Sequence, residues 1–172
     1  EFIDKYKKIE IVFLSKEDIR KRKDMELFLE FSLIKRYDFF IKKLEKKMKE
    51  DLTEKRAFEL LMDKFAQEVR IEELLRNLPD YKEFLKLCSF FNFRKYDKKK
   101  KEYSGQFVNA FFEISAFLFF ENKSKINQKF ISEIFGKTYA EFCGERKLSN
   151  PQAIRRLKEA SIYSKELIND EE

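Results

Sequence analysis

Three segments of this chain of 172 residues concentrate lysine and arginine, the side chains that bind phosphate groups. Residues 35–49, 94–101 and 146–158 hold seven, six and five basic residues against two, one and no acidic residues. Each segment therefore carries +5, while the whole chain carries only +6. Because the rest of the chain is acidic, the positive charge is concentrated, and this pattern predicts an electrostatic interface for nucleic acid.

The cationic side chains expected at that interface lie in or beside predicted loops and on helix faces. They are Lys42, Lys46, Lys49, Arg94, Lys98, Lys99, Lys100, Lys101, Arg146, Lys147, Arg155, Arg156 and Lys158. Tyr37, Tyr96 and Tyr103 stand close to them in sequence, where aromatic rings could stack on bases. Each segment alone also fits a solvated helix face or a mobile lysine loop, and an AT-rich genome would favour lysine without any binding role.

The third segment, 146–158, has the residue types best suited to bind a phosphate group. Asn150 followed by Pro151 predicts a capped helix start, whose free amides and positive dipole attract a phosphate. Arg155 and Arg156 follow one turn later and are able to make bidentate contacts. A helix ending near residue 143 would complete a helix-turn-helix, but the 144–150 connector is longer than the usual turn, so this signal is weak.

Enzymatic chemistry finds little support in the residue types. The chain has no histidine, no phosphate-binding glycine loop and no nucleophile motif, so we expect no enzyme, no cofactor and no metal. Glu113 lies among phenylalanines and would have a raised pKa if buried, as a catalytic acid needs. The favoured interpretation is that Gln106, Asn109 and Glu113 form a narrow polar stripe that faces solvent or hydrogen-bonds internally.

The two cysteines and the N-terminal residues bear on the compartment. Cys88 and Cys143 are expected to be reduced and buried, although sequence alone leaves a disulfide open. Charged residues interrupt the apolar residues of 2–14, which is not typical of a signal peptide. We therefore expect an intracellular protein, cytoplasmic or nuclear.

Composition predicts an all-α fold. Phenylalanine accounts for 21 residues, whereas there are only 3 glycines and 2 prolines, and valine and threonine are scarce. A β-rich fold would need more β-branched residues and more turns. We expect one domain over 1–172, a bundle of about six helices with an N-terminal arm at 1–14 and a frayed acidic tail at 169–172.

The first half of the chain contains the clearest helix signals. Residues 9–14 have strand character and predict a short strand or an extended arm. Ser15 with Asp18 predicts a cap and a helix start near Lys16. Apolar residues spaced by three and four from Leu27 onward predict one long helix over about 24–50.

The second half is predicted from breaks and caps. A helix opens at Thr53 and Glu54, and Pro79 predicts a break before a further helix at about 80–93. Residues 94–104 are expected to be a loop, and 105–121 a helix buried nearly all round. The last two helices are expected after Ser124 and over about 151–168.

These observations predict a non-enzymatic helical subunit for nucleic-acid binding or nucleoprotein assembly. The alternative is a helical protein–protein adaptor or oligomerisation module, because the phenylalanine surplus could form an apolar surface. The expected partners are therefore nucleic acid, protein subunits of a larger assembly, or a second copy of the chain. No membrane partner is expected, because no amphipathic segment leaves an apolar face free.

Overall fold

The computed structural model describes residues 2–9, 11, 13–36, 42–43, 46, 54–97, 99–121 and 162. The protein is mostly helical, as expected, but the structure also contains a small two-stranded sheet that the all-α prediction did not include. The chain divides into two compact units, Glu1–Lys86 and Leu87–Glu172, and each is described by itself. The single domain and the six-helix bundle stay predictions.

The first unit begins with two short helices, α1 (Phe2–Tyr6) and α2 (Lys16–Arg20). Between them, Ile9, Ile11, Phe13 and Leu14 belong to no strand, so strand pairing is not seen at the described positions of 9–14. Phe13 is instead buried, which shows that an apolar residue of this stretch contributes to the core rather than to a sheet. The described part of the arm thus contains a helix, α1, that the sequence did not predict.

The predicted cap of α2 is confirmed atom by atom. Ser15 Oγ accepts a hydrogen bond from the Asp18 amide at 3.1 Å, and Asp18 Oδ2 accepts one from the Ser15 amide at 3.2 Å. This reciprocal arrangement is a capping box, which satisfies two amides that a helix start would otherwise leave without partners.

The next helix, α3 (Lys23–Ile34), is much shorter than the helix expected over 24–50. Leu27, Phe28 and Phe31 are fully buried, as the apolar spacing predicts. The helix ends at Ile34, however, and Lys35 and Arg36 form a turn. Lys42, Lys43 and Lys46 are again helical, whereas Tyr37, Ile41, Leu44 and Met48 of the predicted spacing lie outside the described residues.

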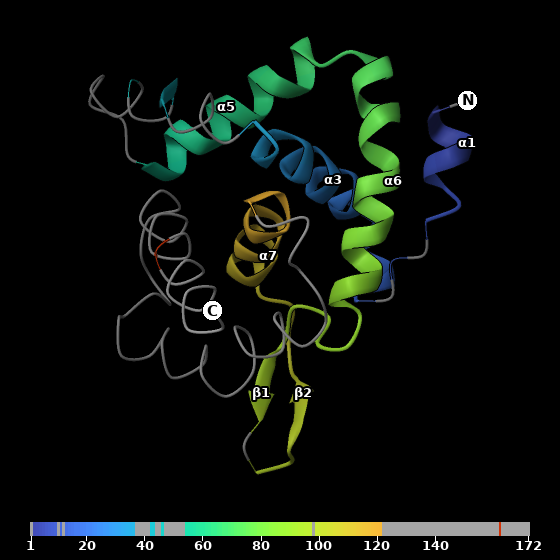
Figure 1. The fold of residues 1–172 in the computed structure, drawn as a ribbon, viewed down its shortest axis with the longest axis vertical. Coiled ribbons are helices and arrows are strands. Elements are labelled where there is room, and N and C mark those ends of the chain that lie inside the picture. Colours follow the sequence, from blue (N-terminus) through green and yellow to red (C-terminus); the bar gives the residue numbers. More distant parts are fainter. Residues whose placement is uncertain are drawn as a thin grey trace, which may run out of the picture. The chain divides into compact units, whose positions relative to one another are not determined.

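Helix α5 (Glu54–Glu68) begins where the sequence predicts and packs against α3. Its buried residues Ala57, Leu61 and Phe65 are spaced by four, so they share one face of the helix. Figure 1 shows α3 and α5 next to each other in the first unit.

Helix α6 (Ile71–Cys88) runs through Pro79, where the sequence predicted a break. Pro79 is exposed, while Leu74, Leu78, Tyr81 and Phe84 form a continuous buried stripe across it. The rings of Phe28 and Phe31 on α3 each lie 5.0 Å from the Tyr81 ring, and Phe31 lies 5.0 Å from Phe84. This packing stabilises both sides of the proline, so tertiary contacts override the local preference.

The second unit begins with the end of α6. That helix ends at Cys88 rather than near residue 93, and Asn92 and Phe93 adopt the left-handed conformation with φ of 49° and 56°. The chain then forms an antiparallel hairpin, β1 (Lys95–Asp97) with β2 (Glu102–Ser104), where a loop was expected. Each strand places one tyrosine between two polar residues, and the contacts of Tyr96 and Tyr103 described below hold the strands together.

Helix α7 (Asn109–Glu121) is the predicted buried helix, although it begins four residues later than expected. Nine consecutive residues, Phe111 to Phe119, are buried, and this confirms the burial predicted for Phe111, Ile114 and Leu118. The same prediction of burial is wrong for Phe107, which is only partly buried because it precedes the helix and follows Gly105, whose φ is +92°.

The remaining predictions fall outside the described residues. They concern the helix after Ser124, the helix over 151–168, the tail at 169–172 and Cys143; of this part only Ile162 is described, as helical and half exposed. Among the helices that the structure does describe, none is both long enough and apolar enough to cross a membrane.

Candidate nucleic-acid interface

The tip of the β1–β2 hairpin presents lysines on a turn whose amides donate to the side chain of Asp97. Asp97 Oδ1 accepts hydrogen bonds from the amides of Lys99 and Lys100 at 2.9 and 3.2 Å. Lys101 then adopts a φ of 56°, which returns the chain to β2. The side chains of Lys99, Lys100 and Lys101 are all exposed, so the turn concentrates three positive charges in solvent.

The tyrosines of the hairpin point to the aromatic residues of their own unit. Tyr96 and Tyr103 are directly opposite each other in the strand register, and their ring centroids lie 5.2 Å apart. Tyr103 also contacts Phe90 and Phe91 edge-on, at 5.6 and 5.7 Å. Burial, and then the proximity of Tyr96, raise the pKa of Tyr103. These rings stabilise the hairpin, so base stacking on them is not the arrangement that the geometry favours.

The opposite face of the hairpin adds no net positive charge. Successive side chains of a strand alternate between faces, so Lys95, Asp97, Glu102 and Ser104 share the face away from the tyrosines. One lysine is outnumbered there by two carboxylates. The cationic character of the hairpin therefore lies at its tip rather than along its strands.

Arg94 stands at the base of the hairpin and is partly buried. Its amide donates to the Phe91 carbonyl at 2.9 Å, and its buried Nε has no hydrogen-bond partner. Because its side chain is partly buried, Arg94 contributes less to a phosphate-binding surface than the exposed lysines of the tip.

The first basic segment, 35–49, is partly neutralised within the first unit. Lys35 Nζ lies 3.0 Å from Asp80 Oδ2 and 2.9 Å from Asn77 Oδ1, and Arg36 pairs with Glu73 at 2.5 Å. All three partners lie on α6, far away in the sequence. Lys42 and Lys46 are exposed and remain available for a partner.

The first basic segment belongs to the unit Glu1–Lys86 and the second to the unit Leu87–Glu172, so each is described within its own unit. Lys49, Lys98, Arg146, Lys147, Arg155, Arg156 and Lys158 lie outside the described residues. The sequence did not predict the role of Asp97, whose side chain accepts hydrogen bonds from the amides two and three residues later. An aspartate that begins a predicted loop is the pattern that indicates such a turn.

The candidate catalytic acid has a structural role in the described geometry. Glu113 is only 6% exposed, and its Oε1 accepts a hydrogen bond from Asn109 Nδ2 at 2.8 Å. Gln106 is exposed and precedes the helix. The internal hydrogen bond that the sequence offered as one alternative for this stripe is therefore formed between Asn109 and Glu113.

Cys88 is buried with a free thiol, as predicted for this cysteine. Burial raises the pKa of the thiol, and a hydrogen bond with Ser115 only partly opposes that shift. A thiol in this state is a poor nucleophile, because the thiolate is the reactive form. Across the part of the chain that the structure describes, no cluster of three or more acidic or cysteine side chains is arranged to hold a metal ion.

Comparison with known proteins adds no assignment to this geometry. No protein-family model matches the chain, and no curated protein or solved structure matches it significantly.

Proposed function

We propose that the protein binds nucleic acid without catalysis and that the hairpin tip contacts the phosphate backbone. The single observation that supports this proposal is the set of three exposed lysines that the Asp97 turn holds together between paired strands. Ordering the turn in the free protein lowers the entropy cost of binding compared with a flexible lysine loop.

The proposed contact carries little sequence information. Lysine ammonium groups at a hairpin tip neutralise phosphates, whereas readout of bases needs side chains that reach base edges or stack on them. The hairpin tyrosines are engaged with each other and with Phe90 and Phe91, which favours backbone contact over base recognition. Exposed Lys42 and Lys46 are the described residues of the first segment that fit a second contact region.

The adaptor alternative draws less support from the described residues. No phenylalanine among them is exposed, because the phenylalanine side chains of the described part are buried or partly buried. The exposed large apolar residues there are isoleucines at separate positions, Ile3, Ile19, Ile71 and Ile162. The phenylalanine surplus is thus used for packing wherever the structure describes it.

The test is a salt titration of binding to mixed-sequence single- and double-stranded DNA and RNA, measured by fluorescence anisotropy. The triple variant Lys99→Gln, Lys100→Gln and Lys101→Gln should reduce the salt slope by about one unit for each lost contact, and by about three at most. Binding to all sequences should weaken alike.

A matched control removes three charges elsewhere. Lys7, Lys8 and Lys16 are exposed in the first unit, so their joint replacement by glutamine causes the same change of net charge. The control should alter the slope by less than the tip variant does. Equal effects of the two variants would show that nucleic acid is attracted by the overall charge and not by the hairpin tip. The absence of binding at low salt would refute the proposed function. A molecular mass that rises with protein concentration would then support the adaptor.

A further inference from the structure

Two carboxylates stand directly behind the lysines of the hairpin tip. Asp97 ends β1 and Glu102 begins β2, and these two residues are partners in the strand register. Lys99, Lys100 and Lys101 follow Asp97 in the turn, and Figure 1 shows the hairpin extending away from α7 with this turn at its far end. A partner that reaches past the lysines therefore meets the two carboxylates next.

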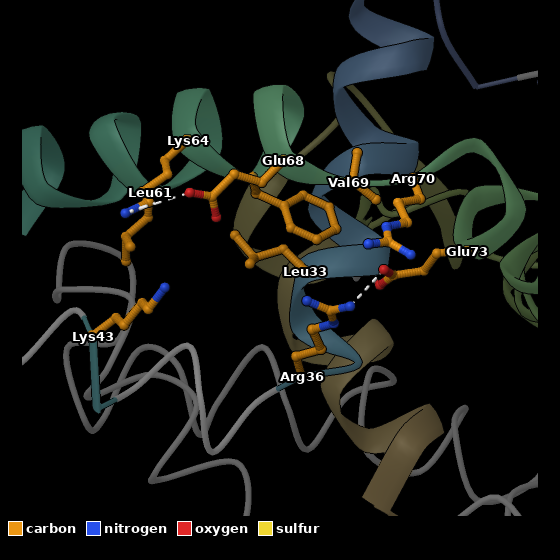
Figure 2. A pocket seen from close by; sticks show the side chains of 10 residues that line it. Leu33, Arg36, Lys43, Leu61, Lys64, Glu68, Val69, Arg70 and Glu73 are labelled. Atoms are coloured by element: carbon orange, nitrogen blue, oxygen red, sulfur yellow. Dashed lines mark hydrogen bonds and ion pairs between the residues drawn. The ribbon is translucent and has the colours of Figure 1, made fainter.

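The lysines of the tip are not neutralised in the way that part of the first basic segment is. Figure 2 shows the guanidinium of Arg36 in that segment turned toward Glu73 of α6, with which it pairs. By contrast, Lys99, Lys100 and Lys101 are exposed, and within the described residues none of them makes an ion pair. The positive charge of the tip is therefore available to a partner.

The two carboxylates behind the lysines differ in their other contacts. Asp97 Oδ1 accepts hydrogen bonds from the amides of Lys99 and Lys100, so this carboxylate is part of the turn. Glu102 is exposed, and in the described part of the chain its side chain makes no hydrogen bond or ion pair. The charge of Glu102 is thus not needed to form the turn, and it lies beside any partner that binds at the tip.

A negative charge at this position affects the two forms of nucleic acid differently. A single strand presents one row of phosphates, which can lie across the lysines on the side away from Glu102. A duplex presents two rows, with about one charge per 1.7 Å of its axis compared with about 3.4 Å for one strand. When one row contacts the lysines, the second row comes within the range of about 10 Å over which charges act at about 0.1 M salt. Repulsion from Glu102 therefore weakens the binding of a duplex more than that of a single strand.

We propose that the hairpin tip takes single-stranded rather than double-stranded nucleic acid as its partner, and that Glu102 is the residue that sets this preference. This inference rests on the proposed function, because it names the form of nucleic acid that the same lysines contact. Discrimination between two similar partners often depends on a repulsive group placed against the wrong one, and an exposed carboxylate next to three lysines is such a group.

The test compares one DNA strand of mixed sequence with its own duplex. The strand carries a fluorophore and is used alone and annealed to its complement, and binding of the full chain to each form is measured by fluorescence anisotropy at low salt. The triple variant Lys99→Gln, Lys100→Gln and Lys101→Gln should lose more affinity for the single strand than for the duplex. A greater loss for the duplex would overturn the proposal.

Glu102→Gln removes the charge and keeps the size of the side chain. The affinity for the duplex should rise about two- to threefold, which is the effect of one charge at roughly 7 Å in water, and the affinity for the single strand should rise less. Glu102→Asp keeps the charge and should keep the ratio of the two affinities found for the wild type. Asp97 is not used for this purpose, because its replacement would also alter the turn.

Glu83→Gln is the matched control, because Glu83 is exposed on α6 in the first unit and its replacement causes the same change of net charge. This variant should change both affinities alike. If Glu102→Gln also changed both affinities alike, the proposal would be overturned, while binding itself would leave the proposed function standing. The absence of binding to both forms would refute the proposed function and this inference together.

Discussion

The ammonium of Lys35 lies 3.0 Å from Asp80 Oδ2, although the two residues are 45 positions apart. The same ammonium donates to Oδ1 of Asn77, which is buried on α6 one turn earlier. A lysine that the charge pattern assigns to a phosphate-binding segment is thus part of the contact between the end of α3 and α6. Net charge along a segment overestimates the charge available to a partner when the fold supplies carboxylates.

Lys35→Met should lower the free energy of unfolding by about 1–2 kcal/mol, because it leaves Asn77 Oδ1 and a partly buried Asp80 without their shared donor. Lys21→Met is the control, since the Lys21–Glu17 pair is exposed on both sides and should contribute less than about 0.5 kcal/mol. Urea denaturation measures both variants. Equal shifts would mean that Lys35 acts only as a surface charge.

Pro79→Ala should stabilise the protein by about 1–2 kcal/mol. Proline inside a helix lacks the amide that would donate to the carbonyl four residues earlier, at a cost of about 3 kcal/mol relative to alanine. Proline also restricts the unfolded chain, which offsets up to about 1 kcal/mol of that gain. A lower melting temperature for Pro79→Ala would contradict the continuous α6.

Phe111→Ala should lower the free energy of unfolding by about 3–5 kcal/mol, because it removes a buried ring from α7. Phe120→Ala, which removes a partly buried ring from the end of the same helix, should cost clearly less. Chemical denaturation of the two variants compares them directly. A loss under about 1 kcal/mol for Phe111→Ala would place α7 at the surface.

The capping box predicts a pH effect at Asp18. Hydrogen bonds from the Ser15 hydroxyl and then the Ser15 amide hold the pKa of Asp18 below its ordinary value of 3.8. A carboxyl with a depressed folded-state pKa stabilises the fold above its unfolded pKa and loses that contribution as pH falls through the folded value.

Ser15→Ala should therefore raise the pKa of Asp18 toward 3.8, as measured by carboxyl NMR titration. Ser15→Thr keeps a hydroxyl and should preserve the lowered pKa. An unchanged titration in Ser15→Ala would show that the hydroxyl does not stabilise the ionised carboxylate.

Local signals in the sequence predicted the elements that depend on neighbours in the chain. The Ser15–Asp18 box, the start of α5 at Glu54 and the burial of α7 were all predicted. Each of these features arises from residues within one or two helical turns, where spacing and side-chain type decide the outcome.

The candidate site was predicted only in part, because a charge count identifies cations but not their partners. The lysines of the hairpin tip were named, whereas the Asp97 turn that orders them and the occupied faces of Tyr96 and Tyr103 were not.

The residue types and their spacing were enough to predict that the chain is mostly helical, that Phe111, Ile114 and Leu118 are buried and that positive charge is concentrated in a few segments. Contacts between distant residues explain why α6 continues through Pro79, why 95–97 pairs with 102–104, and why Lys35 and Arg36 are neutralised by α6. The physical reason is the range of the interactions. Helix periodicity and caps are encoded between near neighbours, but packing across a proline, strand pairing and ion pairs are formed by residues that only the folded chain brings together.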